Sequence, residues 1–104
     1  MQNLTVEEFS NIDSLNGVYV FTRNIACPLC KQYEAIIKEK QLNWFIVDIG
    51  KGELQWAIED MLIEGFPTTR YYLDGVVELE MKGILYDKQI KDITIFKEIK
   101  EFQL

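Results

Sequence analysis

Apolar and polar residues follow one another along this chain with the periods of helices and strands, and the period changes at turn-forming residues. Thr5 and Glu8 have the spacing of a capping box, which predicts a short helix over residues 6–12. The run "VYVF" at residues 18–21 is β-branched and aromatic, which predicts a strand buried on both faces. The run "WFIVDIG" at residues 44–50 predicts a second buried strand.

Between these two strands, the pattern is that of an amphipathic helix that begins at Pro28. Its apolar stripe consists of Cys30, Tyr33, Ile36 and Ile37. A strand, a helix and a strand within about 30 residues imply a parallel pair with a right-handed crossover. This unit is the nucleus of a sandwich of the α/β or α+β class.

The middle of the chain predicts another helix and then a hairpin. An amphipathic helix is expected over residues 53–62, with Gly65 ending it in a left-handed cap. From Pro67 onward, two β-rich runs meet at Asp74-Gly75, a dipeptide that favours a tight hairpin turn. These runs predict two antiparallel strands that complete the sheet. The apolar stripe of the helix consists of Leu54, Ala57, Ile58, Met61 and Leu62.

The final segment predicts a helix over residues 87–102 that covers the sheet. We find no repeat, low-complexity segment or linker in the chain. With 104 residues, 48% of them hydrophobic, the chain suits one domain over residues 1–104. The helical ladder of the last segment consists of Ile90, Ile93, Ile99 and Phe102.

The charge of the chain argues against nucleic acid as a partner. The sequence carries 17 acidic and 11 basic residues, for a net charge of -6, which repels phosphate backbones. No stretch approaches the roughly 18 consecutive apolar residues of a membrane span, and the start lacks the pattern of a secretory signal. We expect a soluble, cytoplasmic protein that binds neither nucleic acid nor membrane.

Cys27 and Cys30 are the two cysteines, and they stand at the start of the helix predicted from Pro28. In a reducing cytosol such a pair is seldom a structural staple, and the loop between them is too short to remove much chain entropy. The free N–H groups and the positive dipole end of the helix stabilise a thiolate at Cys27 more than at Cys30. Pro28 fits the first helical position, where its missing N–H has no intrahelical partner.

This placement predicts that Cys27 is a nucleophile and that Cys30, one turn further on, attacks a mixed disulfide formed at Cys27. Arg23 is the nearest positive residue, and either supports the thiolate or is a solvated surface side chain. Other interpretations remain, because C-x-x-C also serves as half of many zinc sites and cysteine packs as a small apolar residue. Structural zinc usually takes four Cys or His ligands, and the chain has no histidine, so we expect neither metal nor cofactor.

A further feature favours redox chemistry: "EGFPTT" places Pro67 at the head of a predicted strand. With this segment, the chain resembles the thioredoxin superfamily, and thioredoxins more than their relatives. The resemblance covers most of the chain in order and spacing: a first helix, "VYVF", Cys27-Pro28-Leu29-Cys30-Lys31, "WFIVD", helix 53–62, "GFPTT", the Asp74-Gly75 hairpin, Gly83 and a last helix.

The resemblance implies a thioredoxin fold of the α/β class, with a mixed sheet of four to five strands and helices on both faces. It implies that Pro67 is a cis-proline beside the active site and that the Phe66 backbone pairs with an extended substrate segment near Cys27. Gly83 would line the same groove. Pro28 and Leu29, between the cysteines, complete the expected substrate-binding set.

The chain departs from the thioredoxin pattern at several positions. Phe21 stands where thioredoxins place a buried aspartate that helps the second cysteine exchange its proton. Trp44 falls near the position of a lysine that partners that aspartate, and Arg23 and Ala26 replace the tryptophans that flank the motif. Pro28 comes first between the cysteines, as in "CPYC" glutaredoxins, which predicts a less reducing potential than that of typical thioredoxins.

The function expected from the residues and the resemblance is a thiol–disulfide oxidoreductase that reduces or exchanges protein disulfides. The expected partners are disulfide-containing proteins and an electron donor, either a thioredoxin reductase or a glutathione system. We expect the protein to be a monomer that acts in electron transport and redox homeostasis. One alternative is a glutaredoxin-like protein, although "MKGILYD" offers one glycine where glutaredoxins have a Gly-Gly-Asp segment. The other is a binding module that uses Ala26, Leu29 and Phe66, with the cysteine pair as a regulatory switch.

Overall fold

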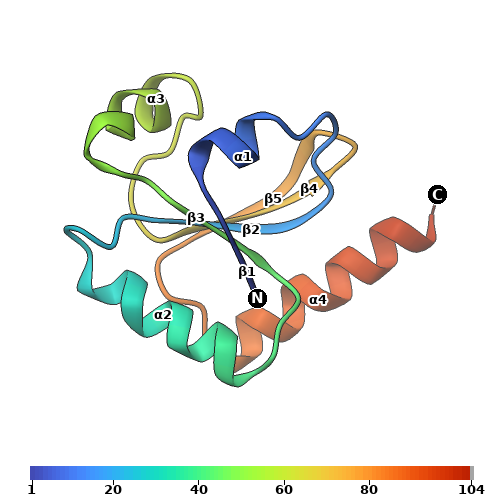
Figure 1. The fold of residues 1–104 in the computed structure, drawn as a ribbon. Coiled ribbons are helices and arrows are strands. Elements are labelled where there is room, and N and C mark those ends of the chain that lie inside the picture. The colour runs from blue at the N-terminus through green and yellow to red at the C-terminus, as the bar shows by residue number, and fades with distance from the viewer. Residues whose placement is uncertain (104) are drawn as a thin grey trace.

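The computed structural model describes residues 1–103, which form a five-stranded mixed sheet with helices on both faces (Figure 1). The strand order is β1-β3-β2-β4-β5, in which β1 and β2 each run parallel to β3, and the β2–β4 and β4–β5 pairs are antiparallel. The expected α/β class and mixed sheet are therefore confirmed. The strands are β1 (Gln2–Leu4), β2 (Gly17–Thr22), β3 (Phe45–Asp48), β4 (Thr68–Leu73) and β5 (Val76–Lys82).

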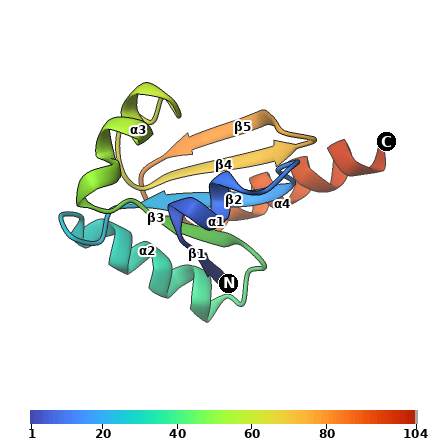
Figure 2. The same ribbon diagram turned by 45° about the horizontal axis from the view of Figure 1, so that its top comes forward.

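The helices divide between the two faces of the sheet. In Figure 1, α2 and α4 lie below the strands and α1 and α3 lie above them, and Figure 2 shows α1 crossing in front of the sheet. A short 3₁₀ turn, η1, leads directly into α3. The bounds are α1 (Val6–Ser10), α2 (Pro28–Glu39), η1 (Lys51–Glu53), α3 (Leu54–Glu59) and α4 (Asp87–Phe102).

Two hydrophobic cores result, one on each face, and β2 contributes to both. Because side chains alternate along a strand, Val18 and Val20 pack on the α2/α4 face, whereas Tyr19 and Phe21 pack on the α1/α3 face. All four are almost inaccessible to solvent, as predicted for a strand buried on both sides. The second core is rich in aromatic side chains, which meet edge to face around Phe9.

The predicted helix starts are confirmed at two places. Thr5 Oγ1 accepts the Glu8 N–H at 3.0 Å and Glu8 Oε1 accepts the Thr5 N–H at 2.9 Å, so the capping box exists. The helix ends at Ser10, before the predicted residue 12, where the Ile12 N–H donates to the Phe9 carbonyl at 3.2 Å in a tighter turn. The following helix begins at Pro28, as expected.

The prediction for residues 53–65 is partly wrong. The α-helix stops at Glu59, and the left-handed residue after it is Leu62, with φ 56°, and not Gly65. The Ile63 N–H donates to the Ala57 carbonyl at 3.0 Å, which turns Ile63 into the core and leaves Leu62 71% exposed. Ile58 is also half exposed, so Ala57 is the one fully buried residue of the predicted stripe.

The hairpin and the last helix have their predicted bounds, with φ of 50° at Asp74 and 80° at Gly75 in the turn. α4 covers the sheet through the buried Ile90 and Ile93 and through Phe96, whose ring lies 6.2 Å from that of Tyr71, whereas Phe102 at its end is 93% exposed. The last turns extend beyond the strands in Figure 1. No helix within residues 1–103 is both long and apolar enough to cross a membrane.

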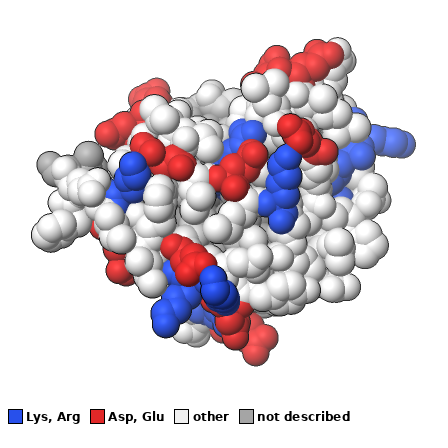
Figure 3. Space-filling view, turned by 180° about the vertical axis from the view of Figure 1, so that it is seen from behind, with Lys and Arg blue, Asp and Glu red and all other residues white. Residues whose placement is uncertain are grey.

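Charged side chains do not gather by sign on the face seen in Figure 3, where acidic and basic groups lie next to one another. Several charged side chains of the protein form ion pairs, such as Lys88 with Asp92 at 3.2 Å and Lys97 with Glu101 at 2.8 Å. Exposed pairs of this kind add little stability. The net charge of -6 is therefore not concentrated into one acidic patch on this face.

Candidate active site

The two cysteines lie where β2 gives way to α2. Cys27 is the N-cap of α2 and Pro28 is its first helical residue, as the sequence predicted. Cys27 and Cys30 are joined by a disulfide, with their Cα atoms 5.3 Å apart. Placing both on the first helical turn brings the sulfurs together without distorting the helix, because Cys30 follows Cys27 by three residues.

The two sulfurs differ in exposure and in hydrogen bonding. Cys27 is partly exposed and Cys30 is completely buried. The Cys30 N–H lies 3.2 Å from Cys27 Sγ, and the Arg23 N–H lies 3.5 Å from Cys30 Sγ. Backbone N–H groups aimed at sulfur favour its anionic form. An incoming reagent can therefore reach Cys27 but not Cys30.

The segment before β4 brings the other predicted residues to the same place. Cys27 Sγ lies 3.7 Å from the Phe66 carbonyl oxygen, and the Phe66–Pro67 peptide bond is cis, as the resemblance implied. The Gly83 N–H donates to the Pro67 carbonyl at 2.8 Å, with a Gly83 φ of 82° that suits glycine. Phe66, Pro67 and Gly83 are thus linked to Cys27 by a short chain of contacts.

An exposed apolar surface borders the cysteine pair. Leu29 is 50% exposed and Ile25 is 60% exposed, and Ala26 and Pro28 are also exposed. The sequence identified Ala26 and Leu29, but not Ile25. A hollow of about 360 Å³ is lined by Asn24, Ile25, Ala26, Cys27, Pro28 and Lys31.

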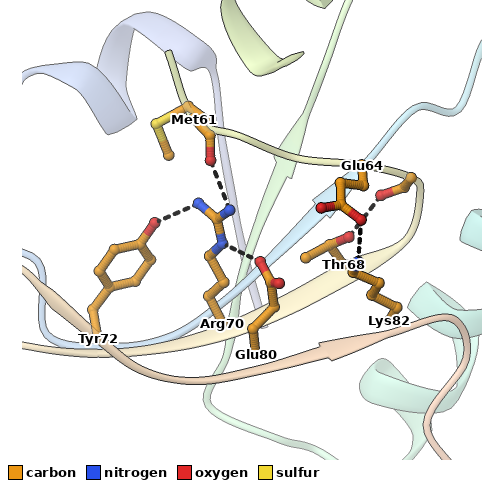
Figure 4. A network of polar contacts seen from close by, with 8 residues as sticks. Met61, Glu64, Thr68, Arg70, Tyr72, Glu80 and Lys82 are labelled. Atoms are coloured by element: carbon orange, nitrogen blue, oxygen red, sulfur yellow. Dashed lines mark hydrogen bonds and ion pairs between the residues drawn. The ribbon is translucent and has the colours of Figure 1, made fainter. Parts of the chain in front are cut away.

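Phe21 is fully buried, and a cation faces its ring. The Arg70 guanidinium carbon lies 5.6 Å from the centroid of the Phe21 ring. Arg70 is only 6% exposed, and it donates to Glu80, Tyr72 and the Met61 carbonyl (Figure 4). Burial disfavours its charge, but the hydrogen bonds to Tyr72 and Glu80 raise the pKa of Arg70 above its ordinary value.

Trp44 does not lie beside Phe21, contrary to the position that the resemblance assigned to it. It packs on the α2/α4 face, with its ring 6.5 Å from that of Tyr33. The residue paired with Phe21 on β3 is Val47. Trp44 and Phe21 are therefore separated by the sheet itself.

Asp48, at the end of β3, fixes the loop that carries the motif. Its Oδ1 accepts hydrogen bonds from the Asn24 N–H at 2.9 Å and from the Thr22 hydroxyl at 3.3 Å. Glu34, on α2, faces the same loop, where burial raises its pKa, the Asn24 side chain lowers it and the Asp48 charge raises it further. No local pattern in the sequence indicates this arrangement, because its partners come from three separate segments.

Comparison with known proteins assigns the fold. No protein-family model matches the sequence, and no curated protein does. Among solved structures, thioredoxin f2 of Chlamydomonas reinhardtii is 21% identical, with a TM-score of 0.71, over 92% of this chain and 95% of that one.

Thioredoxins of Malassezia sympodialis and Plasmodium falciparum are similar to the same degree. The first is 16% identical, with a TM-score of 0.67, over 93% of this chain and 90% of that one. The second is 20% identical, with a TM-score of 0.66, over 89% of this chain and 94% of that one. The chain has the thioredoxin fold, with a C-x-x-C pair at disulfide-bonding distance.

Proposed function

We propose that this protein is a thiol–disulfide oxidoreductase that reduces or exchanges disulfides in proteins. One observation carries the proposal: a partly exposed Cys27 is bonded to a buried Cys30 at the start of α2, 3.7 Å from the Phe66 carbonyl. Each part of this arrangement has a use in thiol–disulfide exchange. The fold of the solved thioredoxins supports the proposal.

In the proposed reaction, the Cys27 thiolate attacks one sulfur of a substrate disulfide. A Cys27–substrate bond forms, the substrate S–S bond breaks, and the first substrate thiolate leaves and takes up a proton. The Cys30 thiolate then attacks Cys27 Sγ, which closes the Cys27–Cys30 disulfide and releases the second substrate thiolate. The substrate gains two electrons and two protons, and the structure corresponds to the oxidised product.

Cys30 must lose its proton for the second step, and no carboxylate stands at Phe21 to accept it. The Arg23 N–H, 3.5 Å from Cys30 Sγ, supports the thiolate as it forms. We propose that the proton leaves with the departing substrate thiolate. The pair is then reduced again by a thioredoxin reductase or a glutathione system, in the cytoplasm and on a monomeric protein.

Substrate specificity would come from the surface around Cys27. An extended substrate segment pairs with the Phe66 backbone beside the cis-proline, Pro67, and passes near Gly83. Pro28 and the exposed Leu29 contact the side of that segment nearest Cys27. This interface needs backbone pairing more than a fixed sequence, which suits a protein that accepts several substrates.

The first test is the redox equilibrium of the cysteine pair in graded thiol buffers, followed by mass after alkylation of free thiols. We expect a reversible two-electron couple between about −270 and −120 mV, the span of known thiol–disulfide oxidoreductases. Cys30→Ser should trap a mixed disulfide at Cys27, whereas Cys27→Ser should trap none and should lose all reductase activity. Reductase activity that survives in Cys27→Ser would refute the mechanism.

The exposed Ile25 and Leu29 favour one alternative, a binding module in which the disulfide is a switch. The double variant Cys27→Ser/Cys30→Ser separates the two functions. A partner that binds this variant as tightly as the wild type, in a protein without reductase activity, would favour the module. Binding that requires the cysteines would favour the enzyme.

A further inference from the structure

The segment of residues 60–67, between α3 and β4, contains no regular helix or strand, yet it carries the carbonyl that lies beside Cys27. Its backbone must be fixed by other means. Side chains from β4 and β5 reach it at three points along its length (Figure 4). Arg70 donates to the Met61 carbonyl, Lys82 pairs with the Glu64 carboxylate, and the Thr68 hydroxyl donates to the Gly65 carbonyl.

The Arg70 contact differs from the Lys82–Glu64 pair because its donor is buried, and from the Thr68 contact because its donor is charged. The Arg70 side chain is 8% exposed, whereas those of Lys82 and Glu64 are 52% and 77% exposed. Its Nη2 lies 2.6 Å from the Met61 oxygen. A hydrogen bond from a charged donor is short and strong, and losing it removes the side-chain partner of the Met61 carbonyl.

The guanidinium is held in one orientation by its other contacts. Nε donates to Glu80 Oε1 at 2.7 Å, Nη1 donates to the Tyr72 hydroxyl at 3.2 Å, and the group faces the Phe21 ring. Because the group is planar and its donors are fixed relative to one another, two bonds to the sheet determine where the third points. The third points at the Met61 carbonyl.

Burial of an arginine for stability alone would be a poor solution. Well-packed apolar side chains of similar volume often stabilise a protein as much as a buried ion pair does. What an apolar side chain cannot supply is a directed bond to a loop carbonyl. The geometry therefore favours a role for Arg70 that depends on the direction of its hydrogen bond to the Met61 carbonyl.

We infer that Arg70 is a positioning residue. Through the Met61 carbonyl it holds the 60–67 segment against the sheet, so that the Phe66 carbonyl stays beside Cys27 and is presented to an extended disulfide substrate. The role of Arg70 in fixing the segment stands on the structure, and its effect on substrates rests on the proposed function.

The test compares Arg70→Lys with Lys88→Gln, which removes a cation from an exposed ion pair on α4, away from the segment. Lysine keeps the charge but lacks the planar set of donors. Backbone hydrogen exchange of the oxidised proteins is followed by mass spectrometry of peptides covering residues 60–67. We expect exchange there to be about tenfold faster in Arg70→Lys, the size expected when a strong hydrogen bond is lost, and unchanged in Lys88→Gln.

The kinetic test uses insulin as a protein disulfide and 5,5′-dithiobis(2-nitrobenzoate) as a small one. The small reagent reacts at Cys27 without pairing along the Phe66 backbone. Arg70→Lys should lower kcat/KM for insulin about tenfold, mainly through a higher KM, and change the rate with the small disulfide less than about twofold. A merely structural role would slow both reactions by the same factor.

Unchanged exchange over residues 60–67, or equal losses with both disulfides, would overturn the inference. If the wild type reduces no disulfide, the proposed function fails, and the exchange measurement alone decides whether Arg70 fixes the segment. Glu64→Gln provides a second variant that is safe for folding, because the Glu64–Lys82 pair is exposed. It should change exchange and the insulin KM in the same direction as Arg70→Lys, by a smaller factor.

Discussion

The two faces of the sheet are built on different principles. On the α2/α4 face the core is made of aliphatic and aromatic side chains, with one buried side-chain bond between Tyr33 and Thr69 at 2.8 Å. On the α1/α3 face the aromatic core surrounds a buried cation, Arg70, whose bonds reach both the sheet and the segment next to Cys27. The α2/α4 face stabilises the fold by burying apolar side chains. The α1/α3 face does the same and also directs hydrogen bonds from Arg70 to the sheet and to the segment next to Cys27.

This difference implies that a given loss of stability has different functional effects on the two faces. Apolar packing tolerates changes of shape as long as volume is conserved. A charged network does not, because each donor has one acceptor at one angle. Variants on the second face should therefore affect the site out of proportion to their effect on unfolding.

The largest effect on stability is expected from Ile37→Ala, a fully buried position of α2 on the apolar face. The free energy of unfolding should fall by about 2–5 kcal/mol, because the cavity cannot be refilled. Disulfide exchange per folded molecule should remain within about twofold of wild type. Urea unfolding followed by circular dichroism gives the first quantity. An exchange rate that falls along with stability would contradict the separation of the two faces.

A smaller loss is expected from Glu80→Gln, which leaves the buried Arg70 without its counter-charge. The free energy of unfolding should fall by about 1–3 kcal/mol. The matched control is Glu78→Gln on the same strand, where the carboxylate lies 3.6 Å from Lys100 at the surface. Only Glu80→Gln should speed hydrogen exchange over residues 60–67. Equal behaviour of the two variants would mean that the network has no directional role.

Removing one hydroxyl from each face provides a closer comparison. Tyr72→Phe removes an acceptor of the charged Arg70 and should cost about 1.5–3 kcal/mol, whereas Tyr33→Phe removes a neutral bond and should cost about 0.5–1.5 kcal/mol. Burial raises the pKa of Tyr33, so its hydroxyl stays neutral over the useful pH range. Thermal unfolding of both variants measures the difference. A larger loss of stability in Tyr33→Phe than in Tyr72→Phe would contradict the proposed difference between the two faces.

The smallest effect is expected from Glu34→Gln, at the polar margin of the α2/α4 face. Burial and the nearby Asp48 charge raise the pKa of Glu34 above 4.5, against the opposing effect of Asn24. A raised folded-state pKa contributes stability below pH 4.5, and this contribution is lost as the pH rises through the folded-state pKa. Wild type should therefore lose more stability between pH 4 and pH 7 than Glu34→Gln does, as urea unfolding at both pH values would measure. A parallel pH dependence would exclude this role for Glu34.

Local signals in the sequence were sufficient for much of the fold and for the placement of the cysteines. The Cys27-Pro28 start of α2 and the Asp74-Gly75 turn depend on neighbouring residues, and both are where the sequence predicted them. β1 was not predicted, because a strand of three residues has no period to detect. It exists because it pairs with β3, which lies about 40 residues further along the chain.

Long-range contacts account for the features that the sequence did not reveal. Ile58 and Leu62 are apolar at helical spacing, yet both are exposed. Leu62 lies beyond Glu59, where the chain leaves the helix. Arg70 stands in an apolar strand sequence, and nothing nearby in the sequence indicates that it meets Met61 and Glu80. Such partners come from the pairing of β4 with β5 and from the path of the 60–67 segment, which no local pattern encodes.

The positions of the two tryptophans give each face its own optical reporter. Trp44 packs beneath the sheet against Tyr33, and Trp56 packs above it against Phe9. A Trp44→Phe variant would report fluorescence from the α1/α3 side alone, and Trp56→Phe from the α2/α4 side alone. If the emission of both variants changes at the same denaturant concentration, the two helical layers unfold together. If the Trp56 emission changes at a lower concentration, the α1/α3 layer unfolds while the α2/α4 layer stays folded.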